Sequence, residues 1–190
     1  MRGLVWMKDG GAEYAEVSLA SELTAVGVAI GTDPAPYRLE YTLRTLPGYM
    51  TELLSVRAHG AGWHRALDLR RSAHGTWSCE TKEEGRLGGP PPGGDMNVLN
   101  GALDCDLGLS PLTNTMPVLR HGLDRCEGRM DFVMAWVQVP HLHVIRHPQR
   151  YTHLGAGAVR YESEGFGADL TLDDDGIVTD YPGLAKLVAS

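Results

Sequence analysis

The chain has 190 residues, 43% of them hydrophobic and 22% charged, so it is long enough to bury a sizeable core as one domain spanning residues 1–190. Its formal net charge of -7 and the absence of any Lys/Arg block exclude nucleic acid and anionic membrane surfaces as expected partners. The 24 glycines and 11 prolines predict many turns rather than long helices.

The N-terminal segment MRGLVWMKDGG lacks the apolar core of a signal peptide, and no segment approaches about 20 consecutive apolar residues. We therefore expect a soluble, cytoplasmic protein without a transmembrane segment. The cysteines Cys79, Cys105 and Cys126 are odd in number and lack CxxC spacing. They predict reduced thiols rather than a disulfide framework or a zinc site.

Alternation of apolar and polar residues is the dominant pattern along the chain. The alternating segments, in chain order, are 13–19, 37–43, 65–71, 103–107 and 166–172. Segment 130–139, MDFVMAWVQV, is apolar on both faces, as expected of a strand near the centre of the fold. Only segment 181–189, YPGLAKLVA, has a pattern that could extend as a helix beyond about two turns. The sequence predicts an all-β protein, either an antiparallel curved sheet or an incomplete barrel, with roughly 10–14 strands and little helix.

Residues 83–101 form a long Gly/Pro-rich loop with almost no periodicity. Loops of this length act as lids over a site or as mobile linkers. The loop leads directly into the strand at 103–107, so a lid over that region is one interpretation. We favour a disordered connector.

The strand LDCDL (103–107) predicts Leu103, Cys105 and Leu107 on the core side, with Asp104 and Asp106 on the other face. Alternate residues of a strand lie about 6.5–7 Å apart. This spacing falls within the range of about 6.5–9.5 Å between the carboxylates of inverting glycosidases, although any two acids at this spacing would satisfy it. The pair could also form a solvated strand face, or it could satisfy polar groups together with Arg120 inside a half-open cavity.

The next segment, SPLTNTMP (110–117), combines Thr113, Asn114 and Thr115 with a proline on each side. Hydroxyl and amide side chains of this kind bond nearby backbone groups in tight turns, which favours a rigid corner. The alternative is that Asn114 and the hydroxyls bind a polar head group.

Histidines and acidic residues in the second half of the chain were considered as metal ligands. His141 and His143 share a strand face, and His147 or His153 could join them, but no acidic residue follows at a convincing offset. We therefore expect surface histidines. The run of three aspartates before Gly176 lacks the distal glutamate of a calcium loop and predicts a hairpin turn at 175–176. The sequence predicts no metal and no cofactor, since it also lacks a phosphate-binding glycine loop and a nucleophile elbow.

The aromatic residues are mostly Trp and Tyr, with only two Phe. Such side chains have an apolar body and a polar tip. They suit a groove for a ligand that is both apolar and polar, and they equally suit an ordinary β core.

Several motifs in order give the chain a family resemblance. PYRLEY (36–41), LDLRR with HGTW (67–77), AWVQVP (135–140) and DDDGIVTDYPG (173–183) accompany the most specific stretch, GALDCDLGLSPLTNTMPVLR (101–120). Together they resemble the bacterial putative glycolipid-binding family nearly end to end. The resemblance implies a β-rich, open-barrel architecture similar to the periplasmic lipoprotein carriers, with a hydrophobic concave face.

One position departs from the family pattern, which has two basic residues after the second proline. Here Val118 and Leu119 precede a single base, Arg120. If both bases of the family contact ligand, Leu119 is a position where the ligand of this chain would differ.

Three functions remain open. The first, which we favour, is non-catalytic binding of an amphiphilic molecule, a glycolipid or other lipid, in the concave face of the sheet. The second is a carbohydrate- or ester-processing enzyme that uses Asp104 and Asp106. The third is a protein-interaction module without a small ligand, and it predicts a filled interior without a cavity of about 300 Å³ or more. The chain is compatible with a homodimer. The predicted head-group contacts are Asp104, Asp106, Thr113, Asn114, Arg120, Arg150, Tyr151 and Tyr161.

Overall fold

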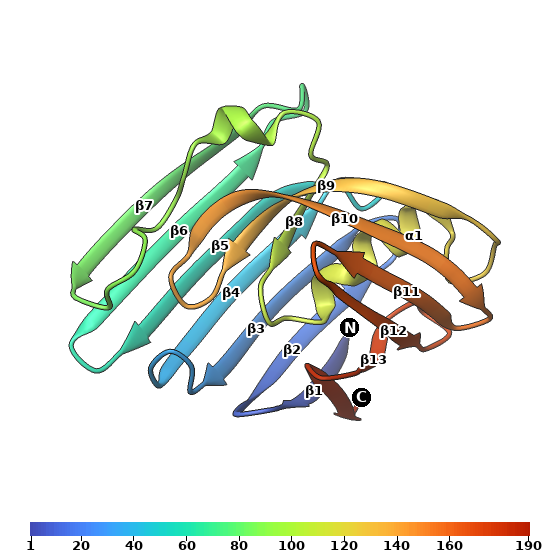
Figure 1. Ribbon diagram of the computed structural model, residues 1–190, viewed down its shortest axis with the longest axis horizontal. Helices are drawn as coiled ribbons and strands as arrows, with labels where there is room; N and C mark the ends of the chain where they lie inside the picture. Colours follow the sequence, from blue (N-terminus) through green and yellow to red (C-terminus); the bar gives the residue numbers. More distant parts are fainter.

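One continuous sheet of fourteen strands forms the framework of the protein (Figure 1), and the computed structural model describes it over all residues, 1–190. Hydrogen-bonded neighbours follow the order β7-β6-β5-β4-β3-β2-β1-β14-β13-β12-β11-β10-β9-β8. Every pair is antiparallel except β8 with β9, which is parallel. The sheet is curved and its two edge strands, β7 and β8, do not pair with each other. The prediction of an all-β, open curved sheet is therefore confirmed.

The elements follow the chain in three groups. The N-terminal half contains β1 (Arg2–Lys8), β2 (Gly11–Leu19), β3 (Leu23–Gly31), β4 (Tyr37–Thr45), β5 (Thr51–Gly60), β6 (Trp63–Arg71) and β7 (Trp77–Gly85). The central segment contains the 3-10 helix η1 (Met96–Leu99), β8 (Asp104–Leu107), the 3-10 helix η2 (Leu112–Asn114) and the α-helix α1 (Thr115–His121). The C-terminal half contains β9 (Arg129–Gln138), β10 (His143–Gly155), β11 (Ala158–Ser163), β12 (Phe166–Leu172), β13 (Val178–Tyr181) and β14 (Ala185–Ala189).

Alternation in the sequence determines which side chains of the N-terminal half point inward. In β4, Leu39, Tyr41 and Leu43 are buried, whereas Arg38 and Glu40 are exposed. The same alternation is clear in β2 and β3, whereas β7 is mostly exposed. The inner face of this half is thus mainly apolar, and it also buries Glu13, Thr45, Thr51 and Arg65.

The C-terminal half rolls back over that surface, with α1 between the two halves in Figure 1. As a result, β8 and the adjoining parts of β9 and β10 are covered on both faces, whereas residues 129–131 of β9 stay exposed. One face, with Cys105, Val137 and Val144, belongs to the main hydrophobic cluster of 30 residues, which it shares with β1–β7. The other face, with Met134 and Tyr151, belongs to a second cluster of 10 residues inside the C-terminal curl, defined here as β8–β14 with η2 and α1. The prediction that segment 130–139 lies at the centre of the fold is correct for residues 134–137, whereas residues 130 and 131 are exposed.

The two halves meet where β1 pairs with β14. Trp6 of β1 is fully buried, and its indole Nε1 donates a hydrogen bond of 2.7 Å to the carbonyl of Val178 in β13. An unpaired indole N–H at this depth would cost about 1–3 kcal/mol, so this bond stabilises the joint between the halves.

The connection 83–101 has a defined path, and the interpretation as a disordered connector is wrong. The backbone of Gly93 forms two hydrogen bonds of 2.9 Å with β10 and the residue before it, at Val144 and Leu142. Leu99 of η1 is fully buried in the main cluster. The guanidinium of Arg65 donates to the carbonyls of Gly88 and Pro90 at 3.1 and 2.6 Å. A buried cation with backbone partners specifies the path of the connection, which composition alone does not reveal.

The C-terminal segment 181–189 is not a helix. Pro182 and Gly183 form a turn in which Leu184 N–H donates to the carbonyl of Tyr181 at 2.9 Å. Gly183 has φ = 78°, a left-handed conformation that glycine adopts readily and that interrupts any helix. The helix that does form, α1, occupies the predicted proline-flanked corner and ends at Gly122 with φ = 64°. No helix in the protein has the length and apolarity required to cross a bilayer.

Candidate functional site

A cavity of about 600 Å³ lies on the concave face of the C-terminal curl. This volume is within the range of small-molecule binding sites, about 300–1,000 Å³. Its lining comes from β8 to β13, Leu184 and the segment before α1. The lining residues are Asp106, Leu107, Gly108, Leu109, Ser110, Asn114, Trp136, Ile145, His147, Tyr161, Ser163, Glu164, Phe166, Tyr181 and Leu184.

Aromatic side chains form two opposite walls of the cavity. On β9 and β10, the rings of Trp136 and His147 are in contact, with centroids 4.7 Å apart and planes tilted by 33°. On β11–β13, Tyr161 lies 6.0 Å from both Phe166 and Tyr181, and the latter two are 6.3 Å apart. Aromatic walls offer flat apolar faces against which a ligand ring or chain can pack.

The floor of the cavity is polar and hydrogen bonded. Asp106 accepts a hydrogen bond of 3.0 Å from the hydroxyl of Thr113 and one of 2.6 Å from Nε2 of Gln149. The hydroxyl of Tyr151 donates to Oδ1 of Asn114 at 2.7 Å. Four predicted residues, Asp106, Thr113, Asn114 and Tyr151, are therefore brought together here, although only Asp106 and Asn114 line the cavity and the other two lie buried behind its lining.

Burial sets the ionisation of this floor. It raises the pKa of Asp106, whereas the hydrogen bonds from Gln149 and Thr113 act in the opposite direction. Burial, together with the charge of Asp106, raises the pKa of Tyr161 to about 12. The phenol of Tyr161 is thus neutral at physiological pH and can donate a hydrogen bond to a ligand.

Asp104 lies next to this floor but does not line the cavity. It is 1% exposed, and Arg120 binds both of its carboxylate oxygens, at 2.6 and 2.5 Å. Burial raises the pKa of Asp104, and the Arg120 guanidinium opposes that shift. The guanidinium carbon also lies 5.8 Å above the ring of Phe132. Asp104 and Arg120 are therefore paired with each other rather than with a ligand. The alternative of a solvated strand face is wrong for Asp104.

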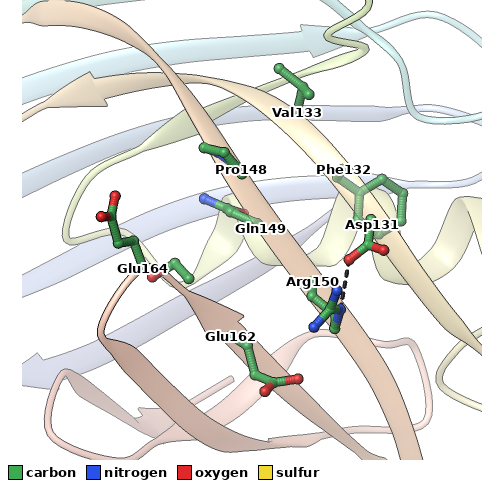
Figure 2. A pocket seen from close by; sticks show the side chains of 9 residues that line it. Asp131, Phe132, Val133, Pro148, Gln149, Arg150, Glu162 and Glu164 are labelled. Carbon is green, nitrogen blue, oxygen red and sulfur yellow. Dashed lines mark hydrogen bonds and ion pairs between the residues drawn. The ribbon is translucent and has the colours of Figure 1, made fainter.

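Arg150 lies apart from the other predicted residues. It neighbours Tyr151 in β10, and adjacent strand residues point to opposite faces, so Arg150 projects from the outer face. There its Nε donates to Asp131 at 2.6 Å (Figure 2). It lines an open depression of about 500 Å³ together with Asp131, Glu162 and Glu164. Four of its nine lining residues are charged and only two are hydrophobic, which makes it a poorer ligand site than the cavity.

Leu119, where the family pattern has a base, also lies outside the cavity lining. Its side chain packs directly against Gly176 in the turn between β12 and β13. The turn begins at Asp173 and confirms the predicted hairpin. A base at position 119 would reach this turn rather than the floor of the cavity.

The histidines do not gather into a metal site. No group of three or more His, Cys, Asp or Glu side chains is arranged to hold a metal ion. Nδ1 of His143 lies 3.2 Å from the carbonyl of Pro91, and Nδ1 of His153 lies 2.7 Å from that of Leu123. These two histidines contact loops, whereas His147 lines the cavity.

Several lining residues were missed as site residues by sequence reasoning. Trp136, His147, Glu164, Phe166 and Tyr181 contact the cavity, and none of them was singled out as a ligand contact. Alternation does place Trp136 on the same face as Met134, and Phe166 on the same face as Ala168. The missing information was that these faces of β9 and β12 enclose one space.

Comparisons with known proteins agree over nearly the whole chain. Residues 3–186 match the model of the family described as "Putative glycolipid-binding". The crystal structure of a DUF1089 family protein from Pseudomonas aeruginosa is similar, with a TM-score of 0.73 and 27% identity, covering 92% of this chain and 91% of that one. Among curated proteins, none matches. The motifs, the open curved sheet and the family match together show that the chain belongs to the Putative glycolipid-binding family.

Proposed function

We propose that the protein binds an amphiphilic, glycolipid-like molecule in the cavity of the C-terminal curl without changing it chemically. The observation that carries this proposal is the polarity gradient of the cavity. Its most buried polar residues, Ser110 and Asn114, lie near Asp106, whereas two apolar residues of its rim are open to solvent. A molecule with one polar end and one apolar end matches this gradient.

The rim supplies the apolar contact. Leu109 is 43% exposed and Phe166 48%, and the partly exposed Leu184 lines the same opening. Covering such residues with an acyl chain would contribute about 25 cal/mol per Å² of apolar surface, or roughly 0.8 kcal/mol per methylene group. In this arrangement the head group lies at the floor and the chain extends along the rim.

The enzyme hypothesis has less support. Acid–base catalysis by two carboxylates needs both to reach the substrate. Asp104 is held by Arg120 behind the lining, and Asp106 already accepts two hydrogen bonds from protein groups. A module without a small ligand is also less well supported, because the interior contains a cavity of about 600 Å³.

Native mass spectrometry of the freshly purified protein tests the proposal. We expect a co-purified lipid-like mass that is lost on denaturation. The matched variants are Ser163→Trp, which fills the cavity from β11, and Ser163→Ala, which leaves it open. The lipid should remain with Ser163→Ala and disappear with Ser163→Trp. A wild-type protein that carries no lipid and takes up none from a bacterial lipid extract would refute the proposal.

A further inference from the structure

The charge of the cavity lining restricts which amphiphiles can bind there. The inference drawn from this charge rests on the function proposed above. Among the fifteen lining residues are two carboxylates, Asp106 and Glu164, but no lysine or arginine. Asp106 lies at the floor, and Glu164 lies at the exposed rim, in the turn between β11 and β12. Negative charge is therefore present at both ends of the cavity.

The neighbouring cations do not offset these charges. Arg120 is held by Asp104 in a bidentate ion pair. Arg150 projects from the outer face and binds Asp131, as Figure 2 shows. An anionic head group would thus lie beside a carboxylate at either end, without a free cation to pair with. Like charges at such distances repel, and burial at the floor strengthens the effect.

The polar groups of the lining suit hydroxyl groups. Asp106 accepts hydrogen bonds, and Asn114 and Tyr161 offer both donors and acceptors, whereas the hydroxyl of Ser110 already donates to Glu13 at 2.6 Å and offers an acceptor only. A sugar hydroxyl donates and accepts at once, so a polyol can satisfy a mixed lining of this kind. A quaternary ammonium group has no hydrogen-bonding group and would form no hydrogen bond with these side chains. The rings of Trp136 and His147, tilted by 33° to each other, provide aromatic surface for the apolar face of a sugar ring.

We infer that the cavity selects amphiphiles with an uncharged, hydroxyl-rich head group and rejects anionic amphiphiles, with Glu164 as a specificity-determining residue at the rim. Fatty acids and anionic phospholipids would be excluded. Neutral glycosides with a single alkyl or acyl chain would be accepted.

Three probes with the same twelve-carbon chain test this selectivity: dodecyl maltoside, dodecanoate and dodecyltrimethylammonium. Each is titrated into the protein below its critical micelle concentration, with binding followed by calorimetry. We expect the maltoside to bind about tenfold or more tightly than dodecanoate, the ratio produced by one unfavourable charge contact in a partly buried site. We also expect it to bind more tightly than the ammonium probe.

Variants of Glu164 test whether this residue causes the weaker binding of dodecanoate. Glu164→Lys should raise the affinity for dodecanoate about fivefold, as expected of a partly exposed charge pair, and should change the maltoside affinity little. Glu164→Gln should give an intermediate value, and it preserves the test if the lysine variant folds poorly. The matched control is Glu162→Lys, because Glu162 lies two residues earlier, at the end of β11, and faces Arg150 on the outer side. This substitution makes the same change in net charge, but Glu162 does not line the cavity.

The possible outcomes distinguish failure of the inferred selectivity from failure of the proposed binding function. If dodecanoate or the ammonium probe binds as tightly as the maltoside, the inferred selectivity is wrong while the proposed binding function stands. If Glu162→Lys raises dodecanoate affinity as much as Glu164→Lys, selectivity reflects overall charge and the role of Glu164 is refuted. If none of the three probes binds, the proposed function fails and this inference with it.

Discussion

The N-terminal half, β1–β7, and the C-terminal curl use the same alternating strands with opposite results. In the N-terminal half the concave face is filled mainly by apolar side chains, with paired polar groups such as Glu13 and Arg65 among them, and by the covered face of β8–β10. In the curl the concave face bears buried polar groups such as Asn114 and Gln149, and it leaves a cavity. The comparison indicates that stability and ligand binding are assigned to different parts of one sheet. The predictions below test that division.

The largest effect on stability should come from breaking the buried ion pair that supports the floor of the curl. Asp104→Ala leaves the guanidinium of Arg120, which is 11% exposed, without its partner. We expect the free energy of unfolding to fall by about 3–5 kcal/mol in chemical denaturation. The control Asp131→Ala removes an ion pair on the exposed outer face and should have little effect. Equal losses for the two variants would show that the curl does not depend on this pair.

A core truncation in the N-terminal half should affect stability without affecting the site. Leu67 of β6 is fully buried in the main cluster. Leu67→Ala should lower the free energy of unfolding by about 2–5 kcal/mol, because it removes apolar contacts and leaves a void. The affinity of the folded variant for dodecyl maltoside should equal that of the wild type. A tenfold loss of affinity would contradict the division between the halves.

A smaller effect should follow from releasing the connection 83–101. Arg65→Met removes the donors that hold the carbonyls of Gly88, Pro90 and His141. Leaving these acceptors unpaired should cost about 1–3 kcal/mol. Hydrogen exchange should increase in this connection, whereas the control Arg70→Met, at an exposed position of the same strand, should leave it unchanged. Unchanged exchange in the Arg65 variant would show that other contacts define the path.

The smallest effect is the pH dependence contributed by Asp106. Burial raises its folded pKa above the ordinary value of 3.8, so the folded state holds this proton more tightly than the unfolded state. Its contribution to stability is full below pH 3.8 and is lost as the pH rises through the folded pKa. The stability of the wild type relative to Asp106→Asn should therefore decrease from acid to neutral pH, as measured by denaturation at each pH. An increase over that range would show that the hydrogen bonds from Gln149 and Thr113 outweigh burial.

Local sequence patterns predicted most of the strands, because the residues that face inward in a hairpin repeat with period two. They also identified Asp106, Thr113 and Asn114, which lie close together along the chain and remain close in the fold. Alternation alone could have separated Arg150 from Tyr151, because neighbours in a strand face opposite ways.

The parallel pairing of β8 with β9 could not be predicted in the same way. It brings Asp106 beside Trp136 through a connection that contains η2 and α1, and no short pattern specifies a pairing over that distance. Asp104 of β8 is buried because Arg120 of α1 covers its carboxylate. The enclosure of the cavity by β9, β10, β11 and β12 depends on the same long-range curl.

A crystal structure of the protein grown with dodecyl maltoside below its critical micelle concentration would show whether the cavity of the curl holds the ligand. We expect a sugar ring against Trp136, with hydroxyls bonded to Asp106 and Asn114, and the alkyl chain along Leu109 and Phe166. The N-terminal half should contain no ligand. A maltoside bound on the outer face beside Arg150 and Asp131, or an empty cavity at saturating concentration, would contradict the account.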